Sequence, residues 1–521
     1  MTDDRRPEPE PGHGPDDPDL EDPLTADDVI AQANSGRPEG SDSQASRLVA
    51  LARARYRLLR GEDGRSYATE RCGPAVAYGL RGREALRRRL ARAYFETYRG
   101  TPGGSALTDA VTVLEGMAEV APSEPVGLRV APIGDGAVVL DLAGEDGRCV
   151  VLDGNGWEVS ANSPVLFRRS ALTSVLPEPE RGGSLDGLRS LLNVDESRFR
   201  LVAAWLVAAL MPSIPHPILA LTGEQGTAKS TAARIVVSLV DPSPAPLRTA
   251  PHDLRSWAAA ASASWIVALD NVSSIQPWFS DTLCKAVTGD GIVARALFTD
   301  EDITVISFRR CIALTTIDAG RLAGDLAERL LPVELARIPA ARRRPDAEIT
   351  DRYRRDCPSI LGALLDLVSD VLATLPTVRL DELPRMADFA RILAALDDVR
   401  GWDTLATYRA AAADATQAVL ESDPVAEAVL AFVGRGGGWR GTSSDLLDRI
   451  TPERRPRGWP QTPRGLSGAL ARLAPALRAH GVVFERATRG SERLIMLRAE
   501  EPPSDAPAQP SRQSRPSREG S

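Results

Sequence analysis

The feature that most constrains the fold is a glycine-rich loop between a strand and a helix. Pro217–Thr222 is a short apolar run, Gly223–Ser230 reads GEQGTAKS, and Thr231–Val240 has the spacing of an amphipathic helix. This order is close to the strand–GxxxxGK[ST]–helix arrangement of a P-loop. Backbone N–H groups of such a loop and the helix N-terminus converge on a phosphate. The pattern predicts an α/β unit with a largely parallel sheet.

The chemistry of the loop residues predicts how a triphosphate is held. We expect Lys229 to reach the β- and γ-phosphates and the Ser230 hydroxyl to bind Mg²⁺, so that ATP and Mg²⁺ are the expected cofactors. The last glycine of the pattern is replaced by Ala228, whose methyl group is small enough for binding to survive. The predicted nucleotide-contacting residues are Gly223, Glu224, Gln225, Gly226, Thr227, Ala228, Lys229, Ser230 and Thr231.

Lysine usage supports the same assignment. The chain has only two lysines, Lys229 and Lys285, and its other 61 basic residues are arginine. A lysine kept against such a bias indicates a position that needs a compact ammonium and not a guanidinium fork.

A second strand carries the predicted metal-binding acid. Trp265–Asn271 consists of apolar residues followed by Asp270, which we expect to hold Mg²⁺ through water. Many ATPases have Glu at the next position to orient the attacking water, whereas this chain has Asn271. An amide positions water but accepts a proton poorly, so the identity of the catalytic base stays open.

Composition excludes several protein classes. The sequence has no run of 18 apolar residues, which argues against a membrane span. Its acidic, proline-rich N-terminus is not a secretory signal. Five scattered cysteines without a CxxC pair argue against a zinc site or a disulfide framework. We therefore expect a cytoplasmic protein with reduced thiols.

Charge is unevenly distributed along the chain. Residues 1–45 hold 13 acidic and 3 basic side chains, whereas residues 46–100 hold 14 arginines and 5 acids. Residues 424–500 are also rich in arginine. The overall charge of −8 therefore hides two basic regions that could meet phosphate, although arginines on solvated helix surfaces would give the same pattern.

The composition shifts predict seven segments. We expect an α/β core with a parallel sheet, flanked by an N-terminal α+β region and by C-terminal helical domains, the last of which resembles a winged helix. Helices are expected at Ser46–Arg60, Arg83–Tyr98 and Ser105–Val120. The expected segments are a disordered acidic tail (1–45), an N-terminal helical region (46–125), a small β meander (126–180), the ATPase core (181–340), a helical lid or linker (341–422), a winged-helix domain (423–499) and a disordered tail (500–521).

The segment Cys284–Thr316 carries a resemblance to a known family. It reads CKAVTGDGIVARALFTDEDITVISFRRCIALTT, a lysine-bearing helix followed by TGD, IVAR, an acidic turn between two strands, a basic pair and an apolar strand. This resembles motif B′ and the β-hairpin of superfamily 3 helicases of the phage and mobile-element primase–helicase type. It looks closest to ATP-binding proteins of actinobacterial phages and integrative elements, and it implies an AAA+ P-loop fold over roughly residues 46–499.

The resemblance implies DNA contacts near a central channel. Lys285, Asp290 and Arg295 lie in the segment that supports the hairpin in relatives. The hairpin tip, Thr299–Asp302, is acidic here, which favours DNA contact by Arg295, Arg309 and Arg310.

It also implies further catalytic positions. Ile312–Thr315 matches the sensor strand, where Thr315 replaces the usual Asn. Arg329 matches the arginine that such ATPases insert into the neighbouring subunit's site, which requires a homo-oligomeric ring, commonly a hexamer.

The C-terminal region resembles a winged helix. Thr462–His480 would be its recognition helix, with Arg464, Arg472 and Arg478 available to phosphate. Pro475 is expected to kink or break this helix. The expected wing lies at Thr488–Ser491.

Three functions remain open from the sequence. The first is a ring-forming, ATP-driven DNA helicase or translocase, working with a separate primase or replication initiator because no primase motif is evident. The second is an ATP-binding switch or DNA-binding regulator that hydrolyses slowly, which the departures at Ala228, Asn271 and Thr315 favour. The third is a structural replication scaffold, which would tolerate Lys229→Ala.

Overall fold

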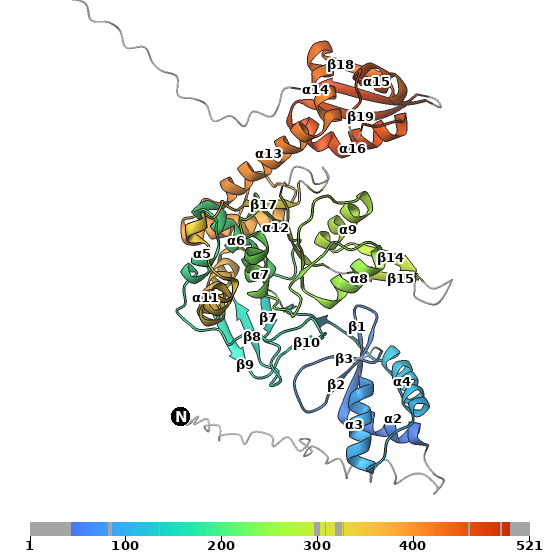
Figure 1. The fold of residues 1–521 in the computed structure, drawn as a ribbon. Coiled ribbons are helices and arrows are strands. Elements are labelled where there is room, and N and C mark those ends of the chain that lie inside the picture. Colours follow the sequence, from blue (N-terminus) through green and yellow to red (C-terminus); the bar gives the residue numbers. More distant parts are fainter. Residues whose placement is uncertain are drawn as a thin grey trace, which may run out of the picture. The chain divides into compact units, whose positions relative to one another are not determined.

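The computed structural model describes residues 43–81, 86–134, 136–295, 303–307, 309–317, 326, 328–456, 459–489 and 492–500. The tails predicted at 1–45 and 500–521 lie outside these residues, except for Ser43, Gln44 and Ala45 at the start of the first described helix and for Glu500. The chain divides into two compact units, residues 1–125 and 126–521, which are described separately (Figure 1).

The first unit is a mixed α+β fold and not the purely helical region predicted for 46–125. Its helices are α2 (Gln44–Arg55), α3 (Leu86–Tyr98) and α4 (Gly104–Glu119). Its sheet has the order β3-β2-β1-β4, with the strands β1 (Tyr56–Gly61), β2 (Ser66–Glu70), β3 (Tyr78–Gly79) and β4 (Ser123–Glu124).

The helix expected to reach Arg60 ends five residues earlier. A turn through Asp63 and Gly64, where Gly64 has φ 75°, folds β1 back onto β2. An Asp-Gly turn of this kind favours a hairpin, and here it outweighs the helical spacing of the preceding residues.

The second unit begins with an antiparallel β meander of order β6-β7-β8-β9. The strands are β6 (Val130–Ile133), β7 (Ala137–Asp141), β8 (Cys149–Asp153) and β9 (Gly156–Ser160). A separate two-stranded pair joins β5 (Val126–Gly127) to β10 (Leu166–Phe167). Alternating apolar residues and tight turns specify this arrangement.

The centre of the second unit is a five-stranded sheet of order β12-β13-β16-β11-β17, in which all neighbouring strands are parallel. The strands are β11 (Ile218–Thr222), β12 (Leu247–Arg248), β13 (Ile266–Leu269), β16 (Cys311–Thr315) and β17 (Leu330–Glu334). Because β16 lies between β13 and β11, the carboxyl ends of these three strands meet at one edge of the sheet. The predicted parallel sheet is confirmed.

Helices cover this sheet. They are α5 (Asp186–Leu191), α6 (Glu196–Ala209), α7 (Lys229–Ser238), α8 (Leu254–Ala263), α9 (Pro277–Thr288), α11 (Asp346–Thr374), α12 (Ala387–Arg400) and α13 (Thr404–Ser422). The almost entirely buried helix α6 shares one core cluster with the sheet and the β meander. After α9, β14 (Gly291–Arg295) and β15 (Ile303–Ser307) form an antiparallel ribbon, whose predicted acidic tip lies outside the described residues.

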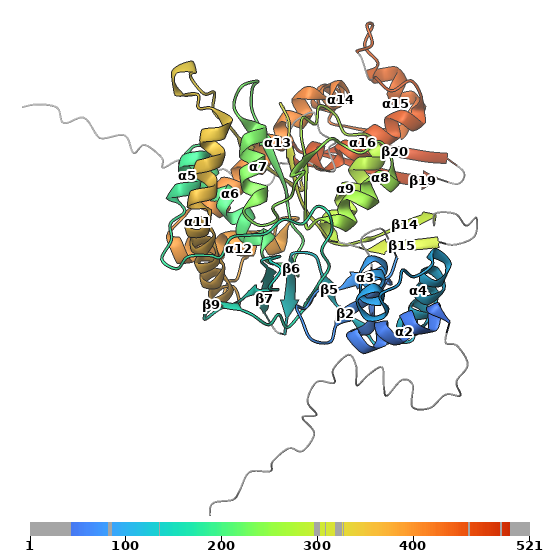
Figure 2. The ribbon, with the colours of Figure 1, turned by 60° about the horizontal axis from the view of Figure 1, so that its bottom comes forward.

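Helix α11 lies beside α5 in both views (Figures 1 and 2). By length and composition it could cross a membrane, and it is the one such helix in the described part of the chain, but 61% of its apolar window is buried. The core helix of a soluble protein passes the same test.

The C-terminal segment has its own core cluster. It contains α14 (Pro424–Gly436), β18 (Gly438–Thr442), α15 (Ser443–Ile450), α16 (Pro463–Ala479), β19 (Val482–Arg489) and β20 (Glu492–Ala499), with sheet order β18-β20-β19. The prediction of a break at Pro475 is wrong, because α16 continues to Ala479. The buried Leu473, Ala476 and Leu477 anchor this last turn and offset the hydrogen bond that proline cannot donate. The residues expected to form a wing, Thr488–Ser491, lie at the end of β19 and between β19 and β20, and 490–491 lie outside the described residues.

Candidate nucleotide site

The glycine-rich loop depends on unusual backbone conformations. Gly223 has φ 140°, and a Cβ there would lie 2.8 Å from the Leu335 carbonyl oxygen. Gly226 has φ 85°. Ala228 caps α7 in the left-handed region, with φ 63° and ψ 33°, which costs a residue with a Cβ about 1 kcal/mol. The motif position that normally holds glycine is therefore under strain here, and strain of this kind concentrates at functional sites.

Lys229 is folded back onto this loop. Its Nζ donates to the carbonyl oxygens of Gly223 at 2.7 Å and of Glu224 at 2.8 Å. The Thr227 hydroxyl donates to the same Glu224 carbonyl at 3.0 Å. Burial lowers the pKa of the Lys229 ammonium, and the charge of Asp270 partly offsets this effect. The ammonium thus lies at the N-terminus of α7, where the helix dipole also favours an anion.

Two predicted hydroxyl groups, from two different segments, donate to one oxygen of the Asp270 carboxylate. The Ser230 hydroxyl donates to Asp270 Oδ1 at 2.8 Å, and the Thr315 hydroxyl donates to the same oxygen at 2.6 Å. Thr315 Oγ1 in turn accepts from the backbone N–H of Asn271 at 2.8 Å. Asn271 follows β13 with φ 54°, a left-handed conformation that Asn tolerates better than most residues. The sheet order places these groups together.

The oxygens of this cluster fit a magnesium ion. Mg²⁺ prefers hard oxygen ligands and is usually held by one or two protein groups together with phosphate oxygens and waters. Ser230 and Asp270 supply a hydroxyl and a carboxylate within hydrogen-bond distance of each other. Among the described residues there is no group of three or more His, Cys, Asp or Glu that could hold a metal without a substrate. Ser230 and Asp270 could hold Mg²⁺ together with the phosphate oxygens of a bound ligand.

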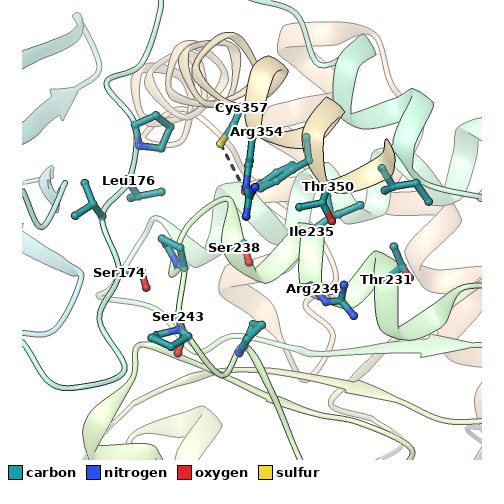
Figure 3. Close-up of a pocket in the computed structure, with 17 residues that line it drawn as sticks. Ser174, Leu176, Thr231, Arg234, Ile235, Ser238, Ser243, Thr350, Arg354 and Cys357 are labelled. Atoms are coloured by element: carbon teal, nitrogen blue, oxygen red, sulfur yellow. Dashed lines mark hydrogen bonds between the residues drawn. The ribbon is translucent and has the colours of Figure 1, made fainter. Parts of the chain in front are cut away.

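A cavity of about 770 Å³ lies along α7, with Thr231 among its lining residues (Figure 3). One wall is the face of α7 that begins at Thr231, the residue after Ser230, and another is the first half of α11. The remaining walls are residues 174–177 and 242–246. Apolar and polar groups alternate around it, namely Val175, Leu176, Ile235 and Ile349 with Ser174, Ser238, Ser243, Thr350 and Tyr353.

Two groups of the α11 wall are themselves paired. Cys357 Sγ donates to the Tyr353 hydroxyl at 3.5 Å. Burial raises the pKa of the Tyr353 phenol well above its usual range, and it also raises the pKa of the Cys357 thiol. Both groups are therefore neutral at physiological pH and act as a hydrogen-bonding surface of the cavity.

Two arginines lie near the loop that the sequence did not predict there. Arg234 Nη1 lies 3.1 Å from both carboxylate oxygens of Asp346 and so joins α7 to the start of α11. The exposed Arg343 places Nη2 3.8 Å from where a Cβ on Gly226 would lie. Both contacts involve the connection between β17 and α11 or the first residue of α11, and no local motif signals where these residues lie.

A buried ion pair holds one wall of the cavity in place. The sequence did not predict this pair either. Arg129 is fully buried, and its Nε donates to Asp241 Oδ1 at 3.0 Å. Its Nη2 donates to the Ser174 carbonyl at 2.8 Å. Asp241 Oδ2 accepts from the backbone N–H groups of Trp265 and Ile266, at 2.8 and 3.0 Å. The pair thus joins the β meander, the cavity wall and the start of β13.

The predicted DNA contacts near the ribbon differ in accessibility. Lys285 is exposed on α9, and the side chain of Arg295 lies outside the description. Arg309 donates to the carbonyls of Pro212 and Thr288, each at 3.3 Å. Arg310 donates to the Ala261 carbonyl at 2.5 Å. The guanidinium groups of the half-buried Arg309 and Arg310 thus bond the protein's own backbone, and their contact with DNA stays a prediction.

The other predicted residues differ in exposure. Arg464, Arg472 and Arg478 are exposed along α16. Arg329 is half-buried directly before β17, and its carbonyl accepts from the Ile218 N–H at 2.8 Å. Asp290 is exposed and accepts from the Thr288 hydroxyl at 2.9 Å.

Two family models match parts of the chain. Residues 185–418 match the family described as actinomycete integrative conjugative element replication protein. Residues 425–513 match the family described as AICE RepA C-terminal domain. Among curated proteins, none matches.

Several solved structures are similar. The apo structure of the NrS-1 C-terminal region (305–718) is 11% identical and covers 88% of this chain and 100% of its own, with a TM-score of 0.35. The A form of the same region has 11% identity, coverages of 86% and 99%, and a TM-score of 0.37. The X-ray structure of JCV helicase is 12% identical and covers 45% of this chain and 72% of its own, with a TM-score of 0.21.

Proposed function

We propose that the protein is an ATP-dependent DNA helicase or translocase of a mobile-element replication system. The observation that carries the proposal is the convergence of Ser230, Asp270 and Thr315 at the end of α7's glycine-rich loop. P-loop ATPases hold Mg²⁺ with the hydroxyl that follows the loop lysine and with the acid of a second strand, and Ser230 and Asp270 match these two groups. The match to a replication-protein family supplies the biological context.

The loop would hold the triphosphate at the N-terminus of α7. Lys229 would exchange its two carbonyl partners for phosphate oxygens, which its charge and the helix dipole both favour. When bound between Ser230 and Asp270, Mg²⁺ would neutralise charge on the phosphates. Asn271 would orient the attacking water, and Thr315 would hold Asp270 in place.

The 770 Å³ cavity would receive the adenosine of the same ATP molecule. It begins at Thr231, next to the phosphate-binding end of α7, and its apolar side chains can enclose a base while its hydroxyl groups bond the base edge and the ribose. We expect Ser238→Trp, which fills the cavity, to weaken ATP binding at least tenfold while leaving inorganic tripolyphosphate binding unchanged. Lys229→Ala should weaken both ligands. Equal loss of both ligands in Ser238→Trp would contradict this placement of the base.

A ring would complete the site. Arg329 would reach the phosphates bound by the neighbouring subunit, for example in a hexamer, and the C-terminal segment would act as a winged helix that contacts DNA through α16. A separate primase or initiator would act with it.

The decisive experiment measures ATP turnover with and without single-stranded DNA. We expect DNA-stimulated turnover for the wild type, and its loss in Lys229→Ala and in Arg329→Ala. Mixing Arg329→Ala subunits with Lys229→Ala subunits should restore part of the turnover if the site is shared, because some interfaces then hold one intact lysine and one intact arginine. Normal turnover of a monomeric Arg329→Ala protein would exclude the shared site.

A second function is favoured by one observation. At Asn271 an amide occupies the position where a carboxylate would accept the proton of water, which suits a switch that binds ATP and hydrolyses it slowly. Such a protein would bind ATP and DNA, yet its turnover would stay near zero and Asn271→Glu would raise it. Unimpaired replication with Lys229→Ala would instead indicate a scaffold.

A further inference from the structure

The outer face of α3 in the first unit combines three cations with an exposed aromatic ring. Arg88, Arg92 and Phe95 are spaced i, i+4 and i+7, so they lie on one side of the helix, and Arg99 follows at i+11 where the helix ends. All four are exposed. The opposite side of α3 packs into the core through Leu86, Leu90, Ala93 and Tyr94.

Phe95 is not needed to complete that core. Its side chain is 49% exposed, whereas its neighbour Tyr94 is 4% exposed and stacks on Tyr98 with ring centroids 4.7 Å apart. A phenyl group held in water between Arg92 and Arg99 offers a flat apolar face with cations on both sides. Stacking on a base and ion pairing with phosphates use these two kinds of group together.

The acidic groups around this face are few and weakly engaged. Glu96 accepts from Arg92 Nε at 2.7 Å and lies 3.7 Å from Arg55. Because this pair is exposed to solvent, a phosphate can compete for Arg92. Within the described residues, Arg88 and Arg99 have no ion pair.

We propose that this face of α3 binds single-stranded nucleic acid, with Phe95 stacked on an unpaired base and Arg88, Arg92 and Arg99 paired with phosphates. The four residues span about 16 Å along the helix, which is a footprint of a few nucleotides. A duplex hides its base faces, and a membrane-bound helix would present a broad apolar face instead of a single ring. The inference rests on the proposed function for the choice of a nucleic acid as partner.

The test uses the full-length protein, without ATP, and a labelled oligo-dT strand. Phe95→Ala should weaken binding by about 5- to 150-fold, the range expected for loss of one base–aromatic stack. Val113→Ala is the matched control, because Val113 is 52% exposed in the same unit but lies on α4, away from the arginines. Its affinity should equal that of the wild type.

Salt dependence tests the arginines separately. Arg88→Gln should reduce the slope of log affinity against log salt concentration by about 0.7, the value for one phosphate contact on a single strand. Arg81→Gln should leave the slope unchanged, since Arg81 precedes α3 and is not part of this face.

Three outcomes would overturn the proposal. These are an unchanged affinity of Phe95→Ala, tighter binding of duplex than of single strand through the same residues, or capture by anionic vesicles in preference to oligo-dT. ATP turnover without DNA, measured on the same preparations, reports the nucleotide site independently. The failure of this surface and the failure of the proposed function are therefore distinguishable.

Discussion

Replacing Thr315 by Val tests whether the hydroxyl at the end of β16 organises the candidate site. The two side chains have nearly the same shape, so the substitution removes the hydroxyl without opening a cavity. It deletes the donor to Asp270 Oδ1 at 2.6 Å and the acceptor of the Asn271 N–H at 2.8 Å. A hydrogen bond to a charged group contributes about 1.5–3 kcal/mol, and the N–H of the exposed Asn271 adds less because water can replace its partner. We expect a total loss of about 2 kcal/mol in the free energy of unfolding.

The assay is urea unfolding followed by tryptophan fluorescence, arranged as a double-mutant cycle with Asp270→Ala. In the Asp270→Ala background the hydroxyl has lost its charged partner, so Thr315→Val should cost only what the Asn271 contact contributes. The coupling free energy between the two positions should be about 1.5 kcal/mol. A coupling below about 0.5 kcal/mol, the usual error of such cycles, would refute the reasoning.

Three further predictions concern stability. Burial lowers the pKa of His216 to about 4, below its unfolded value of 6.5, so the unfolded state binds the proton first as pH falls. The free energy of unfolding should therefore drop by about 2 kcal/mol between pH 7 and pH 5 in urea titrations, and much less in His216→Asn. Ala228→Gly relieves a left-handed alanine and should stabilise the protein by up to about 1 kcal/mol in thermal unfolding. Gly362→Ala would place a Cβ 1.7 Å from the Glu180 carbonyl oxygen and should lower the free energy of unfolding in urea by more than about 3 kcal/mol. Gly116 has open space around it, so Gly116→Ala should stabilise α4 by about 0.5 kcal/mol in the same assay.

Much of the central fold could be predicted because its signals are local. An apolar run followed by the GEQGTAKS loop fixes β11, the turn and α7 within a few residues, and the apolar run ending at Asp270 does the same for β13. Since parallel strands with short connections bring their carboxyl ends to one edge, the meeting of Ser230 and Asp270 followed from two separate motifs.

The features that were missed depend on long-range packing. The cavity wall of α11 comes from a helix about 120 residues after Thr231, and the Arg129–Asp241 pair joins residues 112 positions apart. No periodicity records such contacts. The strand Tyr56–Gly61 was missed for a different reason, because its leucines and arginines also fit a helix and only the turn at Asp63 and Gly64 distinguishes the two.

The buried guanidinium of Arg129 affects how the second unit unfolds. It is hydrogen-bonded to the β meander, to the cavity wall and, through Asp241, to the first residues of β13. None of these can therefore open alone without leaving an unpaired charge in the interior. Local opening that separates them therefore costs nearly as much as global unfolding. Amide hydrogens of β7 and β13 should then exchange as one cooperative block.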